Sequence, residues 1–434
     1  QWHPSHLEPE PPLDAASAVD DTVAWWEKWS GQLEYDGSWN DAVMRSLITL
    51  KALTYAPTGG IAAAPTTSLP EWIGSVRNWD YRYGWLRDSV LTLYALITAG
   101  YHEEAIAWRD WLLRAATGDP SKLQIMYGLA GERRLSEFEL DWLPGYEGSA
   151  PVRVGNAASG QFQLDVYGEV LGSLAFMRDS IATPGAGDDE SWALEVALLE
   201  FLEGAWHQPD DGLWEMRGDR QHFTASKVMA WLAFASAVRS AERFRLPGPV
   251  DRWRANRDEI HAQVCAEGFD PELGSFTQAF GSKQLDASLL YIPVTGFLPA
   301  TDERVRGTVS AIERELLHEG FVLRYRTDHV ADGLPPGEGV FLACSFWLVD
   351  NYMLQGREHD ARALFDRLTA LANDVGLFSE EYDPSAKRQL GNFPQAFTHL
   401  ALVRAAASIS RTGDDWRRIT RDDKSSGARA KATG

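Results

Sequence analysis

Cysteine is nearly absent from this sequence, because only Cys265 and Cys344 occur among its 434 residues. Two cysteines cannot build a disulfide framework or a cysteine metal site, although a single bridge between them stays open. Long apolar runs are also missing, and none reaches the roughly 18 residues of a membrane-spanning helix. Prolines and acidic residues interrupt the first thirty residues, which therefore lack the apolar core of a signal peptide. We expect no membrane partner and a cytoplasmic location, with secretion after removal of a leader as the alternative, since the chain begins at Gln1.

Positive charge is the scarcer sign, with 41 Lys and Arg against 62 Asp and Glu and a formal net charge of −21. This balance argues against a nucleic-acid partner, whose phosphates bind basic surfaces. The ten histidines show no HxxxH or HExxH spacing, and no GxGxxG, GxxxxGKS, GxxxxGKT or GxSxG loop occurs. Zinc hydrolysis, nucleotide binding and a serine-hydrolase elbow therefore lose support. We expect no metal or organic cofactor.

Aromatic residues are abundant by contrast, with 18 Trp, 13 Tyr and 18 Phe. Flat aromatic faces stack on sugar rings or on nucleobases, and the negative charge disfavours the nucleobases. Sugars are therefore the better candidates for a ligand.

Apolar positions recur at i, i+3, i+4 and i+7 along most of the chain, and sustained alternation at period two is almost absent. This pattern predicts an all-α fold. The expected helices are 17–31, 40–54, 84–99, 102–116, 162–180, 189–206, 222–245, 249–267, 285–292, 302–317, 339–355, 358–374 and 393–411. Thr301 is the expected capping residue of helix 302–317.

Short connections alternate with long ones that are rich in Gly, Pro, Trp and Arg. The six long connections are 55–83, 117–161, 207–221, 268–284, 318–338 and 375–392. Long loops that follow alternate helices all emerge at the same end of a closed helical ring. We therefore expect an (α/α)6 barrel of six inner and six outer helices, with the functional loops on one face. A solenoid of helix pairs is the alternative, although no sequence repeat of the solenoid type is visible.

The expected domain organisation follows from this ring. Residues 1–16 look like a linker or remnant, residues 17–418 like one catalytic domain, and residues 419–434 like a flexible tail. We expect neither terminal segment to take part in a reaction.

Three sequence blocks concentrate residues that are suited to chemistry. The first is NWDYRYGWLRD, residues 78–88, at a predicted loop-to-helix junction. Arg87 and Asp88 offer donors and acceptors for vicinal hydroxyl groups there, and Trp85 offers a wall. The alternative interpretation of this block is a buried ion pair among core aromatic residues.

The second block, residues 209–217, places Glu215 between Trp214 and Met216. In a cleft these neighbours would desolvate the carboxyl group and favour its protonated form, as a general acid requires. A surface turn is the alternative. The third block is FSEEYD, residues 378–383, where two adjacent glutamates favour at least one ionised carboxylate, as a base that activates water requires. A solvated acidic run is the alternative there.

Weaker candidates lie within or beside the long loops. They are Tyr127, Asn156, Arg324, Tyr325 and Glu338. Arginine and tyrosine side chains in loops usually bond to the backbone, so none of these residues defines a function by itself.

Seven blocks of the sequence stand in the order found in glycoside hydrolase family 15, the family of glucoamylases, glucodextranases and bacterial trehalases. The blocks are RSLITLKALTYAPTGGIAAAPTTSLPE, RNWDYRYGWLRDS, LPGYEGSAPVRVGNAASGQFQLDVYGE, DDGLWEMRG, LDASLLYIPVTGFLP, GEGVFLACSFWLVD and SEEYD. The sequence resembles this family over essentially residues 40–410. The resemblance implies an (α/α)6 barrel with its pocket in the loops of one face, which agrees with the ring expected from periodicity.

By this resemblance, Glu215 is the general acid that protonates the glycosidic oxygen and Glu380 is the general base for water. A one-residue alignment error would exchange Glu380 with Glu381. Tyr81 matches a catalytic-site tyrosine beside the attacking water, and Tyr325 the partner that orients its hydroxyl group. In an inverting enzyme the two carboxyl groups lie about 6.5–9.5 Å apart, and an α-glucoside gives β-glucose as the first product.

The expected contacts to the sugar follow from the same blocks. The candidate substrate-binding residues are Trp85, Arg87, Asp88, Trp214, Arg324, Tyr325, Glu338 and Asn156. The resemblance thus implies an exo-acting α-glucoside hydrolase for a small oligosaccharide or disaccharide, while the oligomeric state stays open.

Two departures from the family pattern affect the substrate. Met216 stands where fungal glucoamylases carry a second glutamate, which alters the site for the leaving group. Bacterial relatives usually carry an N-terminal β-sandwich, whereas only the stub QWHPSHLEPEPP precedes the predicted helices here. Trehalose, α-1,4 and α-1,6 gluco-oligosaccharides stay open as substrates, and long starch chains are disfavoured.

Two functions of other classes stay in view. A catalytically silent sugar-binding or scaffolding barrel would keep the fold without turnover, although both candidate glutamates are present. An α-barrel prenyl cyclase would require aspartate-rich DDxxD motifs, and Asp20-Asp21 alone does not supply one.

Overall fold

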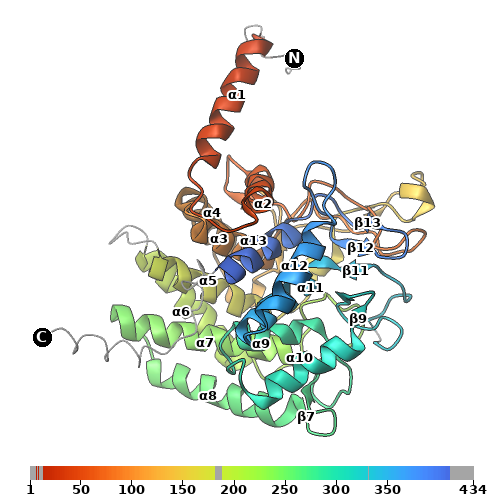
Figure 1. The fold of residues 1–434 in the computed structure, drawn as a ribbon. Helices are drawn as coiled ribbons and strands as arrows, with labels where there is room; N and C mark the ends of the chain where they lie inside the picture. Colours follow the sequence, from red (N-terminus) through yellow and green to blue (C-terminus); the bar gives the residue numbers. More distant parts are fainter. Residues whose placement is uncertain (1–5, 7, 9–12, 181–187, 331, 411–434) are drawn as a thin grey trace, which may run out of the picture.

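The computed structural model describes residues 6, 8, 13–180, 188–330 and 332–410, and its α-helices form a double ring (Figure 1). The inner elements are α3 (Leu86–Thr98), α5 (Asp165–Ser180), α7 (Thr224–Phe244), η4 (Ala287–Leu290) with α9 (Tyr291–Val294), α11 (Leu342–Leu354) and α13 (Ala396–Ser410). Each inner element packs on the next, and α13 packs back on α3. This closing contact confirms the barrel and contradicts the open solenoid.

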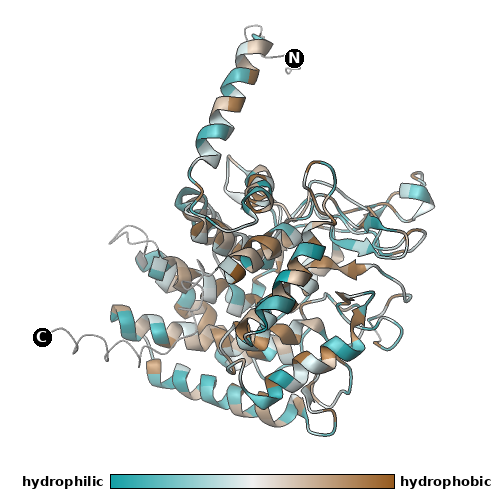
Figure 2. Ribbon diagram, viewed as in Figure 1, coloured by the Kyte–Doolittle hydropathy of each residue, from teal (hydrophilic) through white to brown (hydrophobic). Residues whose placement is uncertain are grey.

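The outer helices each cover one or two inner elements. They are α2 (Asn40–Ala52), α4 (His102–Ala115), α6 (Asp188–Ala205), α8 (Val250–Glu267), α10 (Glu303–Glu315) and α12 (Glu358–Thr369). Inner helices are apolar on most sides, and every residue of α11 from Leu342 to Tyr352 is buried. Outer helices bury a single stripe, as α8 does with Trp253, Ile260 and Val264. Figure 2 shows the remaining surface of α8 as largely hydrophilic.

Helix α1 (Ala15–Ser30) precedes the ring and projects away from it (Figure 1). The Asp14 side chain caps it by accepting hydrogen bonds from the backbone N–H groups of Ala16 and Ser17. The predicted tail 419–434 and most of the predicted linker 1–16 lie outside the described residues. The division at residues 17 and 418 therefore stays a prediction.

Short strands lie in the long connections before the inner helices, except in the connection before α7. A three-stranded sheet joins β11 (Val340–Phe341), β12 (Glu381–Asp383) and β13 (Arg388–Leu390), and β3 (Gly84–Trp85) pairs with β4 (Met126–Tyr127). The other pairs are β1 (Thr54–Tyr55) with β2 (Gly60–Ile61), β5 (Phe138–Glu139) with β6 (Arg153–Val154), β7 (Phe269–Asp270) with β8 (Ser275–Phe276), and β9 (Leu317–His318) with β10 (Phe321–Val322). Strands of two or three residues are too short to show alternation in the sequence.

Helix boundaries differ from the prediction where a strand or a cap intervenes. Helix α11 begins at Leu342 rather than at 339, because Val340 and Phe341 pair with β12. Helix α10 begins at Glu303 with Asp302 as its cap, since the Asp302 side chain accepts the N–H of Arg304. The prediction of Thr301 as the cap was wrong by one residue.

Two open points of the sequence are answered by the structure. Cys265 and Cys344 are both free, so the possible bridge between them is absent. Among the described residues, we find no helix that combines the length and the apolar character needed to cross a bilayer.

Candidate active site

A cavity opens at the end of the ring where the inner helices begin, with about 610 Å³ of space free of protein atoms. Its lining comes from five of the six long connections expected from the sequence, and the described part of connection 268–284 contributes no lining residue. Arg87, Phe341 and Phe397, at the starts of α3, α11 and α13, complete the wall. The cavity therefore assembles segments that are far apart in the chain.

Glu215 reaches this cavity from a tight turn. Its backbone lies in the left-handed region with φ of 58°, and its N–H bonds to the carbonyl oxygen of Gly212 at 3.0 Å. Trp85 Nε1 donates to Glu215 Oε1 at 2.6 Å, and Arg87 Nη2 lies 3.6 Å from the same oxygen. The Glu215 side chain keeps 20% exposure, so a ligand in the cavity can reach its carboxyl group.

Glu380 faces the same cavity from the connection before α13 and is 3% exposed. The hydroxyl group of Tyr81 donates to Glu380 Oε1 at 2.7 Å. The second oxygen, Oε2, is buried and has no hydrogen-bond partner among the described residues. Burial, and next the nearby carboxylate of Glu71, raise the pKa of Glu380 well above its ordinary range. The solvated acidic run considered for this block is wrong, because Glu380 and Glu381 are both buried.

Arg87 and Asp88 form a mostly buried ion pair next to Glu215. Arg87 Nε lies 3.4 Å from Asp88 Oδ2, and Arg87 Nη1 donates to the carbonyl oxygen of Leu213 at 2.9 Å. Burial raises the pKa of Asp88 to about 6, despite the favourable charge of Arg87. Arg87 lines the cavity, whereas Asp88 is 2% exposed and does not.

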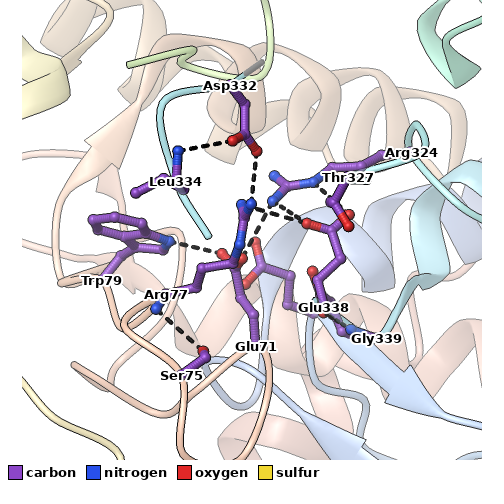
Figure 3. A network of polar contacts seen from close by, with 12 residues as sticks. Glu71, Ser75, Arg77, Trp79, Arg324, Thr327, Asp332, Leu334, Glu338 and Gly339 are labelled. Carbon is purple, nitrogen blue, oxygen red and sulfur yellow. Dashed lines mark hydrogen bonds and ion pairs between the residues drawn. The ribbon is translucent and has the colours of Figure 1, made fainter. Parts of the chain in front are cut away.

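Arg324 lies in a network of buried charges at the edge of the cavity (Figure 3). Its Nε donates to Glu338 Oε1 at 2.8 Å and its Nη2 to Glu338 Oε2 at 2.6 Å, with a further bond from Nη2 to Glu71 Oε2 at 3.2 Å. Arg77 Nη1 lies 3.5 Å from Glu338, and Arg77 Nη2 donates to Asp332 Oδ2 at 2.7 Å. The carboxylates of Glu338 and Glu71 thereby hold the guanidinium group of Arg324 in one position.

The same network is where a cation could bind. Glu71, Glu338 and Glu381 each offer an oxygen within 4.8 Å of the others. The guanidinium group of Arg324 already bonds to two of these carboxylates and supplies positive charge there. Glu71 and Glu338 therefore fix an arginine in this structure.

Two aromatic residues predicted for the site also line the cavity. Trp214 Nε1 donates to Asp286 Oδ1 at 2.8 Å, and the indole stacks on Trp347 with ring centroids 5.8 Å apart. The hydroxyl group of Tyr325 donates to Asp332 Oδ2 at 2.9 Å. The expectation that Tyr325 orients the hydroxyl of Tyr81 was therefore wrong, because each tyrosine bonds to a different carboxylate.

The predicted residues divide into two groups by position. Those that line the cavity are Tyr81, Arg87, Asn156, Trp214, Glu215, Arg324, Tyr325 and Glu380. The three that do not are Trp85, Asp88 and Glu338. Trp85 is buried behind Glu215 and holds it, so the structure does not place the indole as a wall of the cavity. Glu338 lines a neighbouring cavity with Trp72 and holds Arg324 from the far side. Tyr127, one of the weaker candidates, is fully buried and does not line the cavity.

Several lining residues escaped the sequence analysis. They are Glu71, Arg77, Trp79, Arg217 and Asp332. All of them except Asp332 stand within the quoted family blocks, and that position was the available signal. Trp79 is held between two guanidinium groups, with Arg153 4.6 Å and Arg217 4.3 Å from its ring centroid. The ion pair of Arg77 could not be predicted, because its partner Asp332 is 255 residues away.

Comparison with known proteins shows what this chain is similar to. Residues 37–407 match the family model described as glycosyl hydrolases family 15. The chain is 43% identical over 417 residues to a trehalase of Mycolicibacterium smegmatis, covering 94% of this chain and 61% of the relative. It is 41% identical over 392 residues to a trehalase of Thermoplasma acidophilum, covering 90% of this chain and 66% of that relative. The chain thus spans about three fifths to two thirds of the length of these curated relatives.

A solved structure shares the fold. A bacterial glucoamylase complexed with acarbose superposes with a TM-score of 0.71 at 15% identity, covering 94% of this chain and 61% of that chain. At this identity the likeness concerns the arrangement of the helices.

Proposed function

Because the chain belongs to glycosyl hydrolase family 15, we propose that it hydrolyses a short α-glucoside, with trehalose as the preferred substrate. The observation that carries the proposal is the pair of glutamates on one cavity, of which Glu380 has a buried oxygen without a partner. Such an oxygen is suited to accept a proton from water. A small disaccharide is the only partner that the proposal requires, and a cytoplasmic location stays a prediction.

The proposed reaction is a single inverting displacement. Glu215 gives its proton to the glycosidic oxygen while the bond from that oxygen to the anomeric carbon breaks. Water attacks the anomeric carbon from the opposite face and gives its proton to Glu380 Oε2, so that both protons are accounted for. Tyr81 donates to Glu380 Oε1 at 2.7 Å, so Oε2 is the oxygen without a donor among the described residues and is the proposed acceptor of the proton.

The choice of trehalose rests on two observations. The relatives with 43% and 41% identity are named trehalases. Met216, buried beside Glu215, replaces the second glutamate of fungal glucoamylases, and its side chain offers no hydrogen bond of comparable strength to the sugar beyond the scissile bond. Isomaltose and maltose are the substrates to compare.

The test is to incubate the chain with trehalose, isomaltose and maltose and to follow the anomeric protons of released glucose by NMR. Inversion of trehalose frees one β-glucose and one α-glucose, because only the cleaved carbon is inverted. Two α-glucose molecules at early times would contradict the inverting mechanism. Release from maltose or isomaltose with none from trehalose would contradict the substrate.

Variants of the two glutamates test the assignment. Glu215→Gln and Glu380→Gln should each lower kcat by about 10²–10⁴-fold or more, since each removes one proton transfer. Glu259→Gln, an exposed position on α8, is the matched control and should keep full turnover. Glucose binding by the unchanged chain without any release of glucose would support the sugar-binding barrel instead.

A further inference from the structure

Glu71 is a buried carboxyl group that the reaction proposed above does not use. It lies in the connection before α3, is 1% exposed, and lines the cavity. Both of its peptide groups are fixed, because its N–H bonds to the carbonyl oxygen of Arg77 at 3.0 Å and its carbonyl oxygen accepts the N–H of Gly339 at 3.1 Å. The side chain is therefore held in one place.

The two oxygens of Glu71 both have donors. Trp79 Nε1 donates to Oε1 at 2.8 Å, and Arg324 Nη2 donates to Oε2 at 3.2 Å (Figure 3). Glu380, by contrast, has one donor, Tyr81, and one bare oxygen. Hydrogen bonds to a carboxylate favour its charged form. Negative charge is thus better stabilised on Glu71 than on Glu380.

The charges around Glu380 do not balance. Four buried glutamates, Glu71, Glu338, Glu380 and Glu381, are accompanied by the guanidinium groups of Arg77 and Arg324. Arg77 also pairs with Asp332, which uses part of its charge. Carboxyl groups therefore outnumber guanidinium groups here, and the charge on each carboxylate disfavours ionisation of its neighbours.

We propose that Glu71 is a positioning residue for the hydrolysis: its fixed carboxylate holds Arg324 at the edge of the cavity and, by repulsion, makes Glu380 a stronger base. This inference rests on the proposed function. A stronger base takes the proton of the attacking water more readily. It also becomes protonated, and therefore inactive, at a higher pH.

The electrostatics of the site agree in direction. After burial itself, Glu71 is the largest cause that raises the pKa of Glu380, and the same holds for Glu381. Tyr81 and Arg324 act in the opposite direction on Glu380, while Asp88 raises its pKa further. Removal of the charge on Glu71 leaves the hydrogen bond from Tyr81 and the bidentate contact of Arg324 with Glu338 in place, and it eases the ionisation of Glu380.

The test is the pH profile of kcat/KM in Glu71→Gln, whose amide keeps the shape of the side chain and an acceptor oxygen. The acid limb should move to lower pH by about one unit, as expected for the loss of one neighbouring charge in a partly screened site. The plateau kcat should fall about tenfold because the base is weaker. An acid limb at the same pH as in the unchanged chain would overturn the proposal.

Glu338→Gln is the matched comparison. This variant also loosens Arg324, since it removes the bidentate partner of the guanidinium group. It should raise KM while the acid limb moves less than in Glu71→Gln. Equal effects of both variants on KM, with no difference in their acid limbs, would show that Glu71 acts only as a support for Arg324.

An infrared titration of the buried carboxyl band separates this inference from the proposed reaction, because it needs no substrate. The band that disappears in Glu380→Gln should titrate at lower pH in Glu71→Gln. A shifted band in a chain that hydrolyses no glucoside would overturn the reaction and keep the electrostatic role of Glu71.

If Glu71→Gln does not fold, Trp79→Phe removes one donor from Glu71 and should shift the same band in the same direction by less. An unmoved band would overturn the electrostatic role.

Discussion

Tyr81 and Trp85 pack edge to face, with ring centroids 5.2 Å apart and planes at 68°, and each donates a hydrogen bond to a different carboxyl group of the cavity. Glu380 and Glu215 are thus attached to one aromatic pair just before α3. Because the two hydrogen bonds have different donors and different acceptors, a single substitution can remove one and leave the other in place.

Trp85→Phe should lower kcat by about 10- to 100-fold with a smaller change in KM. The substitution keeps most of the ring packing and removes the donor that fixes Glu215, and small displacements of a reacting group cost about this much. Steady-state kinetics on trehalose measures the effect. Trp253→Phe is the control, because its indole N–H is buried on α8 without a partner among the described residues. An equal loss in both variants would contradict the role of the Trp85 bond.

Tyr81→Phe should move the acid limb of kcat/KM to higher pH. The hydroxyl of Tyr81 stabilises the charged form of Glu380, so its removal raises the pKa of Glu380 further. Since the base must be ionised to act, activity is then lost at a higher pH on acidification. The direction is opposite to that expected for Glu71→Gln. Profiles that shift to the same side in both variants would contradict the assignment of Glu380 as the base.

Gly391→Ala should abolish most turnover. Gly391 has φ of 77°, and an added Cβ would lie 2.9 Å from Glu380 Cβ and 3.0 Å from Glu380 Oε2. Gly356→Ala is the matched control, because Gly356 also has φ of 77° but no atom within 4 Å of an added Cβ. Both variants should lose about 1 kcal/mol or more of unfolding free energy from backbone strain. Only Gly391→Ala should lose activity, as measured by kcat on trehalose.

The free energy of unfolding should fall as the pH rises from about 4 to 7. Burial raises the pKa of Asp88 and Asp165 to about 6 and of Asp210 to about 7, from an ordinary value of 3.8. In this range the folded chain holds protons that the unfolded chain has released, so stability is present at low pH and lost as the pH rises through these values. Denaturant unfolding at pH 5, 6, 7 and 8 measures the slope.

Asp165→Asn removes one of the titrating groups and should make that slope less steep. Ion-paired carboxyl groups with a lowered pKa, such as Glu137, make the folded state more stable as the pH rises, but only at the acidic end of this range. Stability that increases steadily from pH 5 to 8 would contradict the raised pKa values of Asp88, Asp165 and Asp210.

The ring itself could be predicted from the sequence, because its cause is repeated along the chain. Inner helices such as α11 are apolar on most sides, and they alternate along the chain with outer helices such as α8 that bury one apolar stripe. Even the short inner element at Ala287–Val294 was visible as an apolar segment after the long connection 268–284. The two candidate glutamates were found for a different reason, since they stand in blocks that resemble a family.

The buried ion pairs around the cavity could not be predicted, because each joins residues that are far apart in the chain. Arg77 bonds to Asp332 across 255 residues, and Arg324 bonds to Glu71 across 253. Nothing near any of the four in the chain distinguishes a buried ion from a solvated one. For the same reason Trp85 and Glu338 were expected at the sugar, whereas they hold the residues that line the cavity.

The cavity wall begins at Glu71 and ends at Phe397, in the first turn of the last inner helix. A chain that stops before α11 has Arg77 and Glu71 in place but lacks the strand and helix that carry Glu380 and close the wall. The cavity therefore cannot be complete before α13 has been synthesised and packed on α3. Under the proposed function, hydrolysis would report that the ring has closed.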